Sequence, residues 1–432
     1  MKISLLIASL LLLLISGCTT TKPYRTDYVS PCIYQNTNDC PNSAQTITKT
    51  QKGSEYLLSF FEFGDQGYIH NRKEAYKLLD GYKKLANEED VLLFVFVHGW
   101  HHNALGEPED SNIVEFRNVL SEAADNTNKK VLGVYVGWRG DSVRVPLLDR
   151  INLVNFFTFW ERKNTAHEIG TQGLTSLLLQ IEDTLNHSQN KNHRQITVGH
   201  SFGAAALYSA VGPILEERFI NRRASKNNIV DGYGDLVVLL NPAFEGIKYA
   251  SLFELSQQNC ETYNSRQKPK LAILSSDADK PNAWAFPTGR RVNVLMETHR
   301  IVDLTHCLPS GEETIKINNA DTDRYAVGHN RLLLSHDLKA IDDESLSTSE
   351  KDRILQEPAV LLSSFDGEVW TNSLQDGAIN FGKTILTSRN ITQPNSPYLN
   401  IWTNKEVMSG HNDIWTDEVK MFLYYMVGLT NN

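Results

Sequence analysis

Beyond its first 18 residues, the 432-residue chain has no long hydrophobic run and no excess of positive charge. A membrane-spanning helix needs about 20 consecutive apolar residues, so no later segment is a candidate for one. The 51 Asp and Glu residues outnumber the 42 Lys and Arg residues, which gives a net charge of −9. The sequence therefore predicts no basic surface for nucleic acid, and it contains no internal repeat that would indicate a solenoid.

The chain begins MKISLLIASLLLLLISGC, in which one lysine precedes a short apolar run and then small residues. This order is typical of a secretory signal peptide, predicted here over residues 1–17. Residues 15–18, ISGC, resemble the lipobox of bacterial lipoproteins, which implies that Cys18 is lipidated; an ordinary signal peptide with a chance cysteine is the alternative. Thr19 follows in place of aspartate, which by resemblance to Gram-negative sorting rules implies an outer-membrane anchor with the protein facing the periplasm.

Cysteine is scarce: Cys18 and four others make up the total of five. An even number of cysteines in an exported chain suggests disulfides. Cys32 and Cys40 flank a polar loop, so we predict that they pair with each other. Cys260 and Cys307 would then form the second bridge, although four cysteines permit three pairings and only the local one has a direct argument.

Short apolar runs recur along the chain at intervals that leave room for a helix between them. Near-continuous hydrophobicity in runs of this length is typical of strands that are buried on both faces of a parallel sheet. The fold class is therefore predicted as α/β, with a mostly parallel central sheet and helices on both faces. The runs are YLLSFFEF (56–63), VLLFVFV (91–97), KVLGVYV (130–136), QITVG (195–199), DLVVLL (235–240), KLAILSS (270–276) and YLNIWTNKEVM (398–408).

Three parts are predicted along the chain: the signal peptide at 1–17, lipidated Cys18 on a polar tether over 18–52, and one α/β domain over 53–432. Inside that domain, from about residue 280 to 397, strong periodic segments give way to polar sequence with Pro and Gly. A structureless segment of this length is unusual in a compact core. We therefore predict a lid-like insertion that passes over the top of the sheet before the last strand.

The sequence QITVGHSFGAAALYSA places a serine between two glycines, directly after an apolar run and directly before a helix of small residues. A strand that turns into a helix within so few residues must bend sharply, so neighbouring side chains have to be small. This predicts that Ser201 is a nucleophile at the carboxyl end of a strand, supported by Gly199, His200 and Gly203. The alternative is a tight strand–helix turn with a capping serine.

A second loop, HGWHHNA, follows the strand VLLFVFV upstream of the serine. The backbone N–H groups of Trp100 and Phe202 are predicted to hold an oxyanion, with His98 and Gly99 shaping the loop. His98, His101 and His102 could instead bind zinc. No acidic or cysteine partner has a recognisable ligand spacing, so no metal and no cofactor is predicted.

A serine nucleophile needs a base and a group that orients the base. Asp277 and Asp279 both follow the strand KLAILSS, and we favour Asp279 because it lies farther into the turn. Three histidines compete as the base, and only His411 lies between the last strand and the last helix. The other two, His329 and His336, fall in the predicted insertion, where they cap, hydrogen-bond or line the pocket.

The order Ser201, Asp279, His411, the elbow GHSFG and the upstream HGW resemble the α/β-hydrolase superfamily. More narrowly, FVHGWHHNA, GVYVGWRGD, GHSFGAAAL, LLNPAFE and SGHNDIW are similar to a bacterial group of largely uncharacterised serine esterase-like proteins. The resemblance implies a hydrolase and leaves its substrate open. Trp138 and His329 are candidates for the pocket wall, and residues 241–244 either turn the chain or line the cleft.

These observations predict a serine hydrolase that acts on carboxylic esters at the cell envelope. The expected partners are a small-molecule or lipid ester as substrate and a membrane reached through the N-terminal anchor. An amidase, peptidase or thioesterase with the same triad is the nearest chemical alternative. A lipoprotein that uses the fold only for binding is the alternative from a different class.

Overall fold

The structure, a computed structural model, describes residues 21–36, 39–141, 152–190, 192–222, 228–342, 344, 346–363 and 378–430. Within these residues, twelve strands form one sheet in the order β1-β2-β3-β5-β4-β6-β7-β8-β14-β11-β13-β12. The eight neighbouring strands from β3 to β11 are parallel to one another. Their bounds are Glu55–Phe63 (β3), Lys130–Trp138 (β5), Val91–Val97 (β4), Arg194–His200 (β6), Leu236–Leu240 (β7), Leu271–Ser276 (β8), Tyr398–Thr403 (β14) and His336–Ala340 (β11).

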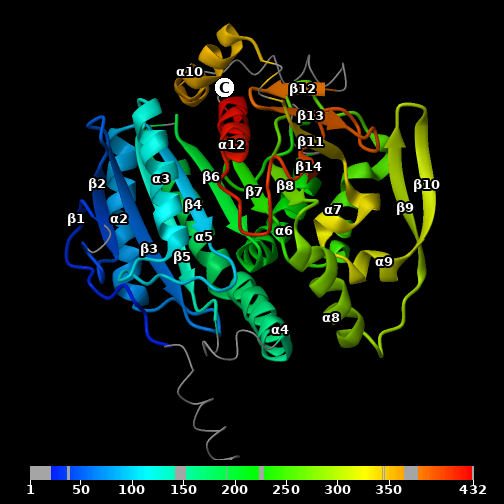
Figure 1. The fold of residues 1–432 in the computed structure, drawn as a ribbon, viewed down its shortest axis with the longest axis horizontal. Coiled ribbons are helices and arrows are strands. Elements are labelled where there is room, and N and C mark those ends of the chain that lie inside the picture. The colour runs from blue at the N-terminus through cyan, green and yellow to red at the C-terminus, as the bar shows by residue number, and fades with distance from the viewer. Residues whose placement is uncertain are drawn as a thin grey trace, which may run out of the picture.

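Helices cover both faces of the sheet, as Figure 1 shows, and two hydrophobic cores fill the two interfaces. Every residue of β4 is buried, because its side chains enter the two cores alternately. The prediction of a mostly parallel sheet with helices on both faces is therefore confirmed. One face carries α2 (Arg72–Glu88), α4 (Asn152–Ile169), η1 (Gly170–Leu174), α5 (Thr175–Asn186), α6 (Phe202–Asn221) and α7 (Gly246–Gln257), and the other carries α3 (Ser111–Asn126), α10 (Thr348–Ser363) and α12 (Asp417–Thr430).

The prediction of a polar tether over 18–52 is wrong for the described residues from Arg25 onward. Strand β2 (Gln45–Lys49) pairs antiparallel with β3, and β1 (Cys32–Tyr34) pairs with β2, so this segment forms one edge of the sheet. The Arg25 side chain is fully buried and donates hydrogen bonds to the carbonyl oxygens of Cys40 and Ala104. Its partners lie far away in the sequence, so local composition gave no sign that this arginine is part of the core.

The interval 280–397 does not pass over the sheet as one insertion. Its second half adds β11, β13 (Thr384–Ser388) and β12 (Ala378–Phe381) to the edge of the sheet beside β14. Its first half forms η4 (Pro281–Ala285), α8 (Phe286–Asn293), α9 (Asn319–Arg324) and a hairpin of β9 (Ile301–Leu308) and β10 (Gly311–Asn318). The added strands are short and half-exposed, with alternating burial, so they lack the continuous apolar runs that identify the central strands.

Both predicted disulfides are present. Cys32 pairs with Cys40, with 5.9 Å between their Cα atoms, and Cys260 pairs with Cys307 at 5.4 Å. The second bridge joins η3 (Gln258–Cys260), which directly follows α7, to β9 across 47 residues. The predicted signal peptide and Cys18 lie outside the described residues.

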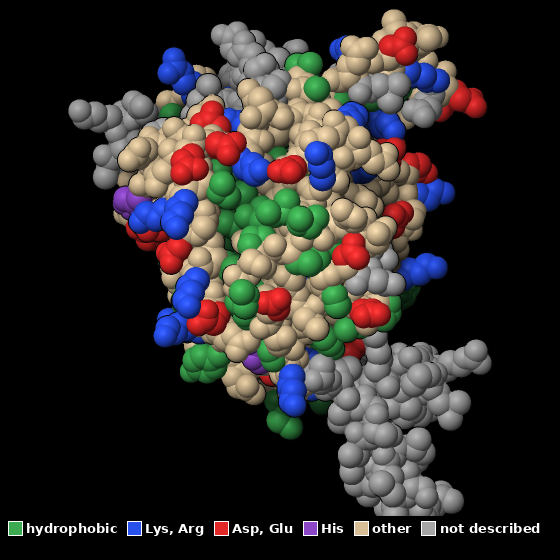
Figure 2. All heavy atoms as spheres, turned by 90° about the vertical axis from the view of Figure 1, so that its left-hand side faces the viewer, with side chains coloured by type: hydrophobic (Ala, Val, Ile, Leu, Met, Phe, Trp, Pro, Cys, Tyr) green, Lys and Arg blue, Asp and Glu red, His purple; other side chains and the backbone are tan. Residues whose placement is uncertain are grey.

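The molecular surface is mixed in charge on the face that presents the β1–β2 edge. Figure 2 shows Lys and Arg interspersed with Asp and Glu on this face, and hydrophobic side chains gathered between them. Within the described part of the chain, no helix has both the length and the apolar character needed to cross a bilayer.

Candidate active site

Four loops meet at the carboxyl edge of the sheet, because the loops that follow neighbouring parallel strands lie next to one another there. Ser201 follows β6, and the segment His98–Trp100 follows the adjacent β4. Asp279 follows β8, and His411 follows the neighbouring β14. Residues separated by up to 210 positions are thereby brought into hydrogen-bonding contact.

Ser201 lies at a strained turn between β6 and α6. Its backbone has φ 54° and ψ −118°, a conformation that non-glycine residues rarely adopt. A Cβ on Gly203 would lie 2.2 Å from the carbonyl oxygen of Val97, and one on Gly199 would lie 2.8 Å from the Cα of Ala204. The two glycines that flank the serine are therefore required by the close approach of the backbone, as the sequence predicts.

His411 lies between Ser201 and Asp279. Its Nε2 atom is 2.7 Å from the Ser201 Oγ, and its Nδ1 atom is 2.8 Å from the Asp279 Oδ1. With the proton on Nδ1, the imidazole donates to the carboxylate and accepts the serine hydroxyl proton at Nε2. The structure therefore brings together the three residues that the sequence singles out for this role.

The Asp279 carboxylate is fully buried. Burial by itself would raise its pKa, but the neighbouring His411 and the backbone N–H of Asn282 favour the charged form, and the net effect is a lowered pKa. The Asn282 side chain donates a further hydrogen bond to the Asp279 Oδ2 at 2.8 Å. Asp279 thus stays ionised and fixed, whereas the competing Asp277 is exposed and its backbone N–H bonds to the carbonyl of Thr403.

Two further residues, Asn241 and His200, fix the loop that carries His411. The buried Asn241 amide donates to the carbonyl oxygens of Gly410 and His411 at 3.1 and 3.0 Å, and its Oδ1 accepts from the Ser276 backbone N–H at 2.9 Å. The His200 Nε2 also donates to the His411 carbonyl, at 2.9 Å. Burial, reinforced by His411, holds the pKa of His200 well below its usual value, so the ring stays neutral.

The role of Asn241 could not be read from the sequence, which left residues 241–244 as a turn or a cleft wall. Asn241 has φ 43°, a left-handed conformation that asparagine tolerates, and it directly follows β7. The sequence signal that could have indicated this role is an asparagine that follows a predicted strand and precedes a proline. Only the fold shows that its side chain links the segments that carry the aspartate and the histidine.

The predicted oxyanion donors lie on the two segments that contact Ser201. Phe202 is the first residue of α6, where the helix leaves its N–H groups without intrahelical partners. A Cβ on Gly99 would lie 3.0 Å from the Ser201 Cβ, so the loop before Trp100 packs directly on the serine. The side chains of Trp100 and Phe202 pack on each other, with ring centroids 5.9 Å apart.

The buried His98 fixes the loop that carries Gly99 and Trp100 through its contacts with Trp138. Its Nε2 accepts from the Trp138 backbone N–H at 3.0 Å, and the Trp138 indole donates to the His98 carbonyl at 2.9 Å. The two rings stack with centroids 5.5 Å apart. Burial lowers the pKa of His98 to about 4, so the ring is neutral and can accept that bond. Trp138 thus supports the loop, and it also lines a cavity of about 150 Å³ at the ends of β3 and β5.

Of the other histidines, His329 lies near the triad and His336 lies away from it. Burial lowers the pKa of His329, and the charges of Asp279 and His411 also act on it. Its ring packs edge-on against Trp402, with centroids 5.2 Å apart. His336 is buried in β11 and contacts the Ser335 hydroxyl.

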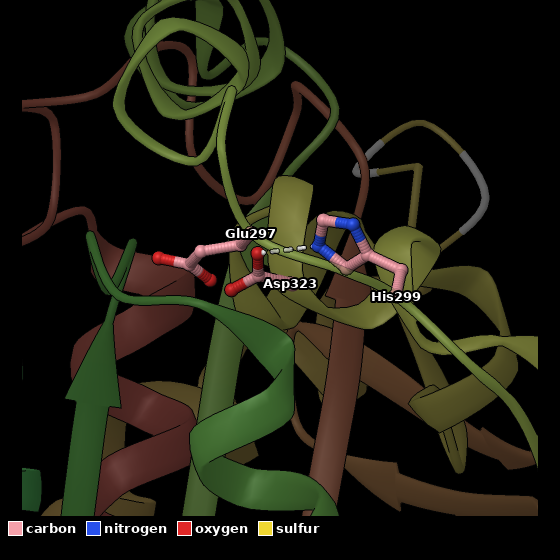
Figure 3. A group of neighbouring side chains, drawn as sticks. All are labelled: Glu297, His299 and Asp323. Atoms are coloured by element: carbon pink, nitrogen blue, oxygen red, sulfur yellow. Dashed lines mark hydrogen bonds and ion pairs between the residues drawn. The ribbon is translucent and has the colours of Figure 1, made fainter.

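The second and third histidines of HGWHHNA each contact a different carboxylate: His101 contacts Asp141 at 2.5 Å, and His102 contacts Asp110 at 2.9 Å. A different cluster, of Glu297, His299 and Asp323, has its ligand atoms within 4.8 Å of one another (Figure 3). The Arg290 guanidinium already donates to the Asp323 Oδ1 at 2.7 Å. This cluster is therefore better described as an ion-pair network than as a metal site.

A cavity of about 590 Å³ opens at the opposite, amino-terminal edge of the sheet. Its lining includes Arg194, Asp235 and Lys270, which precede or begin β6, β7 and β8. Because parallel strands separate their two ends by their full length, this cavity is remote from Ser201 and takes no part in the site.

No family model matches the sequence, and no curated protein is similar to it. Among solved structures, the chain is similar to a Trichoderma reesei cutinase in complex with a C11Y4 phosphonate inhibitor, with 12% sequence identity and a TM-score of 0.22. The similarity covers 48% of this chain and 74% of the cutinase chain. Similarity at this level carries no conclusion about the chain.

Proposed function

We propose that the protein is a serine hydrolase of the α/β-hydrolase fold and that it cleaves carboxylic esters. The main support for this proposal is the pair of hydrogen bonds that connects the Ser201 Oγ through His411 to the buried Asp279 carboxylate. A serine hydroxyl is a weak nucleophile until an adjacent base removes its proton. This arrangement supplies both the base and the group that orients it.

In the proposed acylation step, the Ser201 Oγ attacks the ester carbonyl carbon while the His411 Nε2 takes the hydroxyl proton. Asp279 stabilises the imidazolium that forms and keeps the proton on Nδ1. The N–H groups of Trp100 and Phe202 stabilise the negative carbonyl oxygen. When the tetrahedral intermediate collapses, His411 gives its proton to the departing alkoxide, and the acyl group stays on Ser201.

The second half-reaction uses the same groups with water as nucleophile. His411 takes a proton from a water molecule, whose oxygen attacks the acyl-enzyme carbonyl. Collapse returns the proton to the Ser201 Oγ and releases the carboxylic acid. The described residues supply every proton transfer, so the proposed cycle needs no metal or organic cofactor.

The proposed setting is the cell envelope, with the mature chain anchored through lipidated Cys18 in the outer membrane and facing the periplasm. The support is the lipobox-like ISGC in the sequence and the two disulfides, which form in oxidising compartments. Mass spectrometry of the membrane-extracted protein tests this part. Diacylglyceryl and acyl groups on Cys18 are expected, and an unmodified N-terminus would contradict the anchor.

A fluorophosphonate probe tests the nucleophile. The wild-type protein is expected to be labelled on Ser201, and Ser201→Ala is expected to lose the label. Ser209→Ala, on the same helix α6, is the matched control and should label as wild type does. Folded wild-type protein that stays unlabelled, or label that survives in Ser201→Ala, would count against the proposal.

The reaction class needs a separate comparison, because the same triad serves esters, thioesters and amides. p-Nitrophenyl esters of increasing acyl length, tested beside a thioester and a peptide anilide, should show the highest kcat/KM for an ester. Highest turnover of the anilide would assign a peptidase. No turnover of any substrate by a protein that the probe labels would favour the binding-only alternative.

A further inference from the structure

The segment of residues 281–296, which includes η4 and α8, has one face packed on the domain and another in solvent. Its buried residues, which face the domain, are Asn282, Phe286, Pro287, Gly289 and Val294. A Cβ on Gly289 would lie 2.3 Å from the Trp160 Nε1 of α4, so the helix is pressed tightly against the domain. The other residues of this segment are half-buried or exposed.

The outer side of this segment carries four large apolar residues that are strongly exposed: Trp284 (76%), Val292 (64%), Leu295 (79%) and Met296 (95%). We call these four residues the outer face of α8. Trp284 lies in η4, Val292 lies in α8, and Leu295 and Met296 lie in the turn that directly follows α8. Single exposed apolar residues are ordinary, but four on one short segment are typical of an interaction surface.

An ion-pair network joins this segment to the neighbouring helices. Arg290 donates to the Asp323 Oδ1 at 2.7 Å and lies 3.4 Å from the Glu245 carboxylate. Lys163 of α4 pairs with the same Glu245 at 2.5 Å, and His299 pairs with Asp323 at 3.1 Å. Glu245, which directly precedes α7, thus joins Lys163 of α4 to Arg290 of α8, and Arg290 also joins α8 to Asp323 of α9. Figure 3 shows Asp323 in contact with His299.

The outer face of α8 lies on the same edge of the sheet as the triad. Both η4 and Asp279 directly follow β8, and Ser201 follows β6 at the same carboxyl edge. In Figure 1, α8 projects from the lower side of the molecule beside α4, at the end to which the central strands run. A flat surface that contacts the outer face of α8 would therefore lie at the edge of the sheet that carries the triad.

The N-terminal end of the described chain reaches that edge too. The backbone N–H of Tyr24 donates to Glu62 at 3.0 Å, near the carboxyl end of β3. Cys18 is only seven residues before the buried Arg25, so even an extended chain spans at most about 25 Å between them. An acyl anchor on Cys18 would therefore hold this edge, and not the opposite one, near the membrane.

Charge at the outer face of α8 also suits an anionic lipid surface. Lys280, Arg291 and Arg300 are exposed around it, and Glu297 is the exposed acidic residue of residues 280–300. Arginine and lysine beside exposed Trp, Leu and Met are typical of segments that lie in the headgroup region of a bilayer. This local excess of positive charge contrasts with the net charge of −9 of the whole chain.

We propose that the outer face of α8 inserts into the headgroup region of a phospholipid bilayer and holds the entrance to Ser201 against it. This inference rests on the proposed function: it adds that the substrates are esters of long acyl chains drawn from that bilayer. The occupant is the lipid surface itself, since the anchor and the outer face of α8 share one edge.

The test uses the mature chain with Cys18→Ser, which has every described residue and no acyl anchor, and vesicles of phosphatidylethanolamine and phosphatidylglycerol. Co-sedimentation of this protein with the vesicles is expected, and Trp284→Ser/Leu295→Ser/Met296→Ser should weaken it at least about tenfold. Leu295→Ser alone should weaken it severalfold. Ile220→Ser is the matched control, because Ile220 is a similarly exposed aliphatic residue (57%) at the far end of α6.

Activity assays on the same variants separate the two proposals. The triple variant should hydrolyse soluble p-nitrophenyl butyrate within about twofold of wild type and lose most of its turnover of an ester embedded in the vesicles. Ser201→Ala should bind vesicles normally. Vesicle binding without any ester turnover would contradict the proposed function alone.

Three outcomes would overturn the docking proposal. One is undiminished vesicle binding by the triple variant. Another is the absence of vesicle binding by the parent chain, which would point to a protein partner. The third is a concentration-dependent dimer in light scattering that the triple variant abolishes, which would make a second copy the occupant.

Discussion

The side-chain amide nitrogen of Asn241 lies 3.0 Å from the carbonyl oxygen of His411, although 170 residues separate the two in sequence. The same amide nitrogen bonds to the Gly410 carbonyl, and its carbonyl oxygen accepts from the N–H of Ser276. Asn241 therefore couples the ends of β7, β8 and β14. The geometry of the proposed base depends on a residue that itself performs no chemistry.

Asn241→Ala should lower kcat for a soluble ester by about 10- to 100-fold and change KM less than about threefold. The reason is that the imidazole loses the contacts that fix its loop, while the substrate-binding surface is untouched. Steady-state kinetics and the rate of fluorophosphonate labelling measure the effect. Asn221→Ala, at the opposite edge of the sheet, is the control. A change confined to KM would contradict a positioning role.

His411→Ala should reduce kcat by roughly 10³-fold or more, because His411 is the group among the described residues that bonds to both Ser201 and Asp279. His329→Ala should retain activity within about tenfold, since His329 influences the triad only through its charge and packing. Initial rates on p-nitrophenyl butyrate measure both. The reverse ranking of the two variants would show that the base is His329.

Asp279→Asn should lower kcat by roughly 10³- to 10⁴-fold, because a neutral amide stabilises neither the correct tautomer nor the imidazolium. Asp277→Asn is the matched control on the same turn, and it should behave as wild type because Asp277 is exposed. The kinetic comparison decides between the two aspartates that the sequence leaves in competition. Equal losses in both variants would contradict the assignment of Asp279.

Gly203→Ala should destabilise the protein by roughly 2–3 kcal/mol, because its Cβ would overlap the carbonyl oxygens of Val97 and His98. Gly212→Ala lies in the same helix, where the added Cβ would meet the Tyr208 ring at 3.4 Å, an ordinary contact. The free energy of unfolding of Gly212→Ala should lie within about 1 kcal/mol of the wild-type value or exceed it. Urea unfolding followed by circular dichroism measures both. Equal stabilities would argue against the tight elbow.

The stability of the fold should fall as the pH drops from about 6.5 toward 4. Burial lowers the pKa values of His98 and His336 to about 4 each, below the usual value for histidine near 6.5. Between these values the rings remain neutral in the folded protein and bind protons in the unfolded chain. The unfolded state therefore gains protons, and each histidine contributes a loss of up to about 1.4 kcal/mol per pH unit.

Urea unfolding at pH 7.5, 6 and 5 measures this dependence. The stability that the two neutral histidines contribute is fully present above pH 6.5. His336→Gln should make the free energy of unfolding depend less on pH, because glutamine does not titrate. His336 is a suitable choice because it is buried in β11, away from Ser201. A variant whose stability varies with pH as wild type does would contradict the argument.

The central strands and the elbow were within reach of the sequence because their signals are local. A strand buried on both faces needs a continuous apolar run, and a serine turn this tight needs glycine on both sides of it. The order of serine, aspartate and histidine along the chain was equally visible. The edge strands β11, β12 and β13 were not, because half-exposed strands carry a mixed pattern that polar loops share.

By itself, the sequence determined the parallel sheet, the position of the serine turn and the local Cys32–Cys40 bridge, since these follow from apolar runs, glycine spacing and two cysteines that flank one short loop. The tertiary structure alone decided that Asp279 and not Asp277 contacts His411, that Arg25 is buried, and that Asn241 fixes the histidine loop. Each of these depends on partners that are brought together from distant segments. Hydrogen bonds form between atoms that are neighbours in space, and the order of residues along the chain does not record which atoms those are.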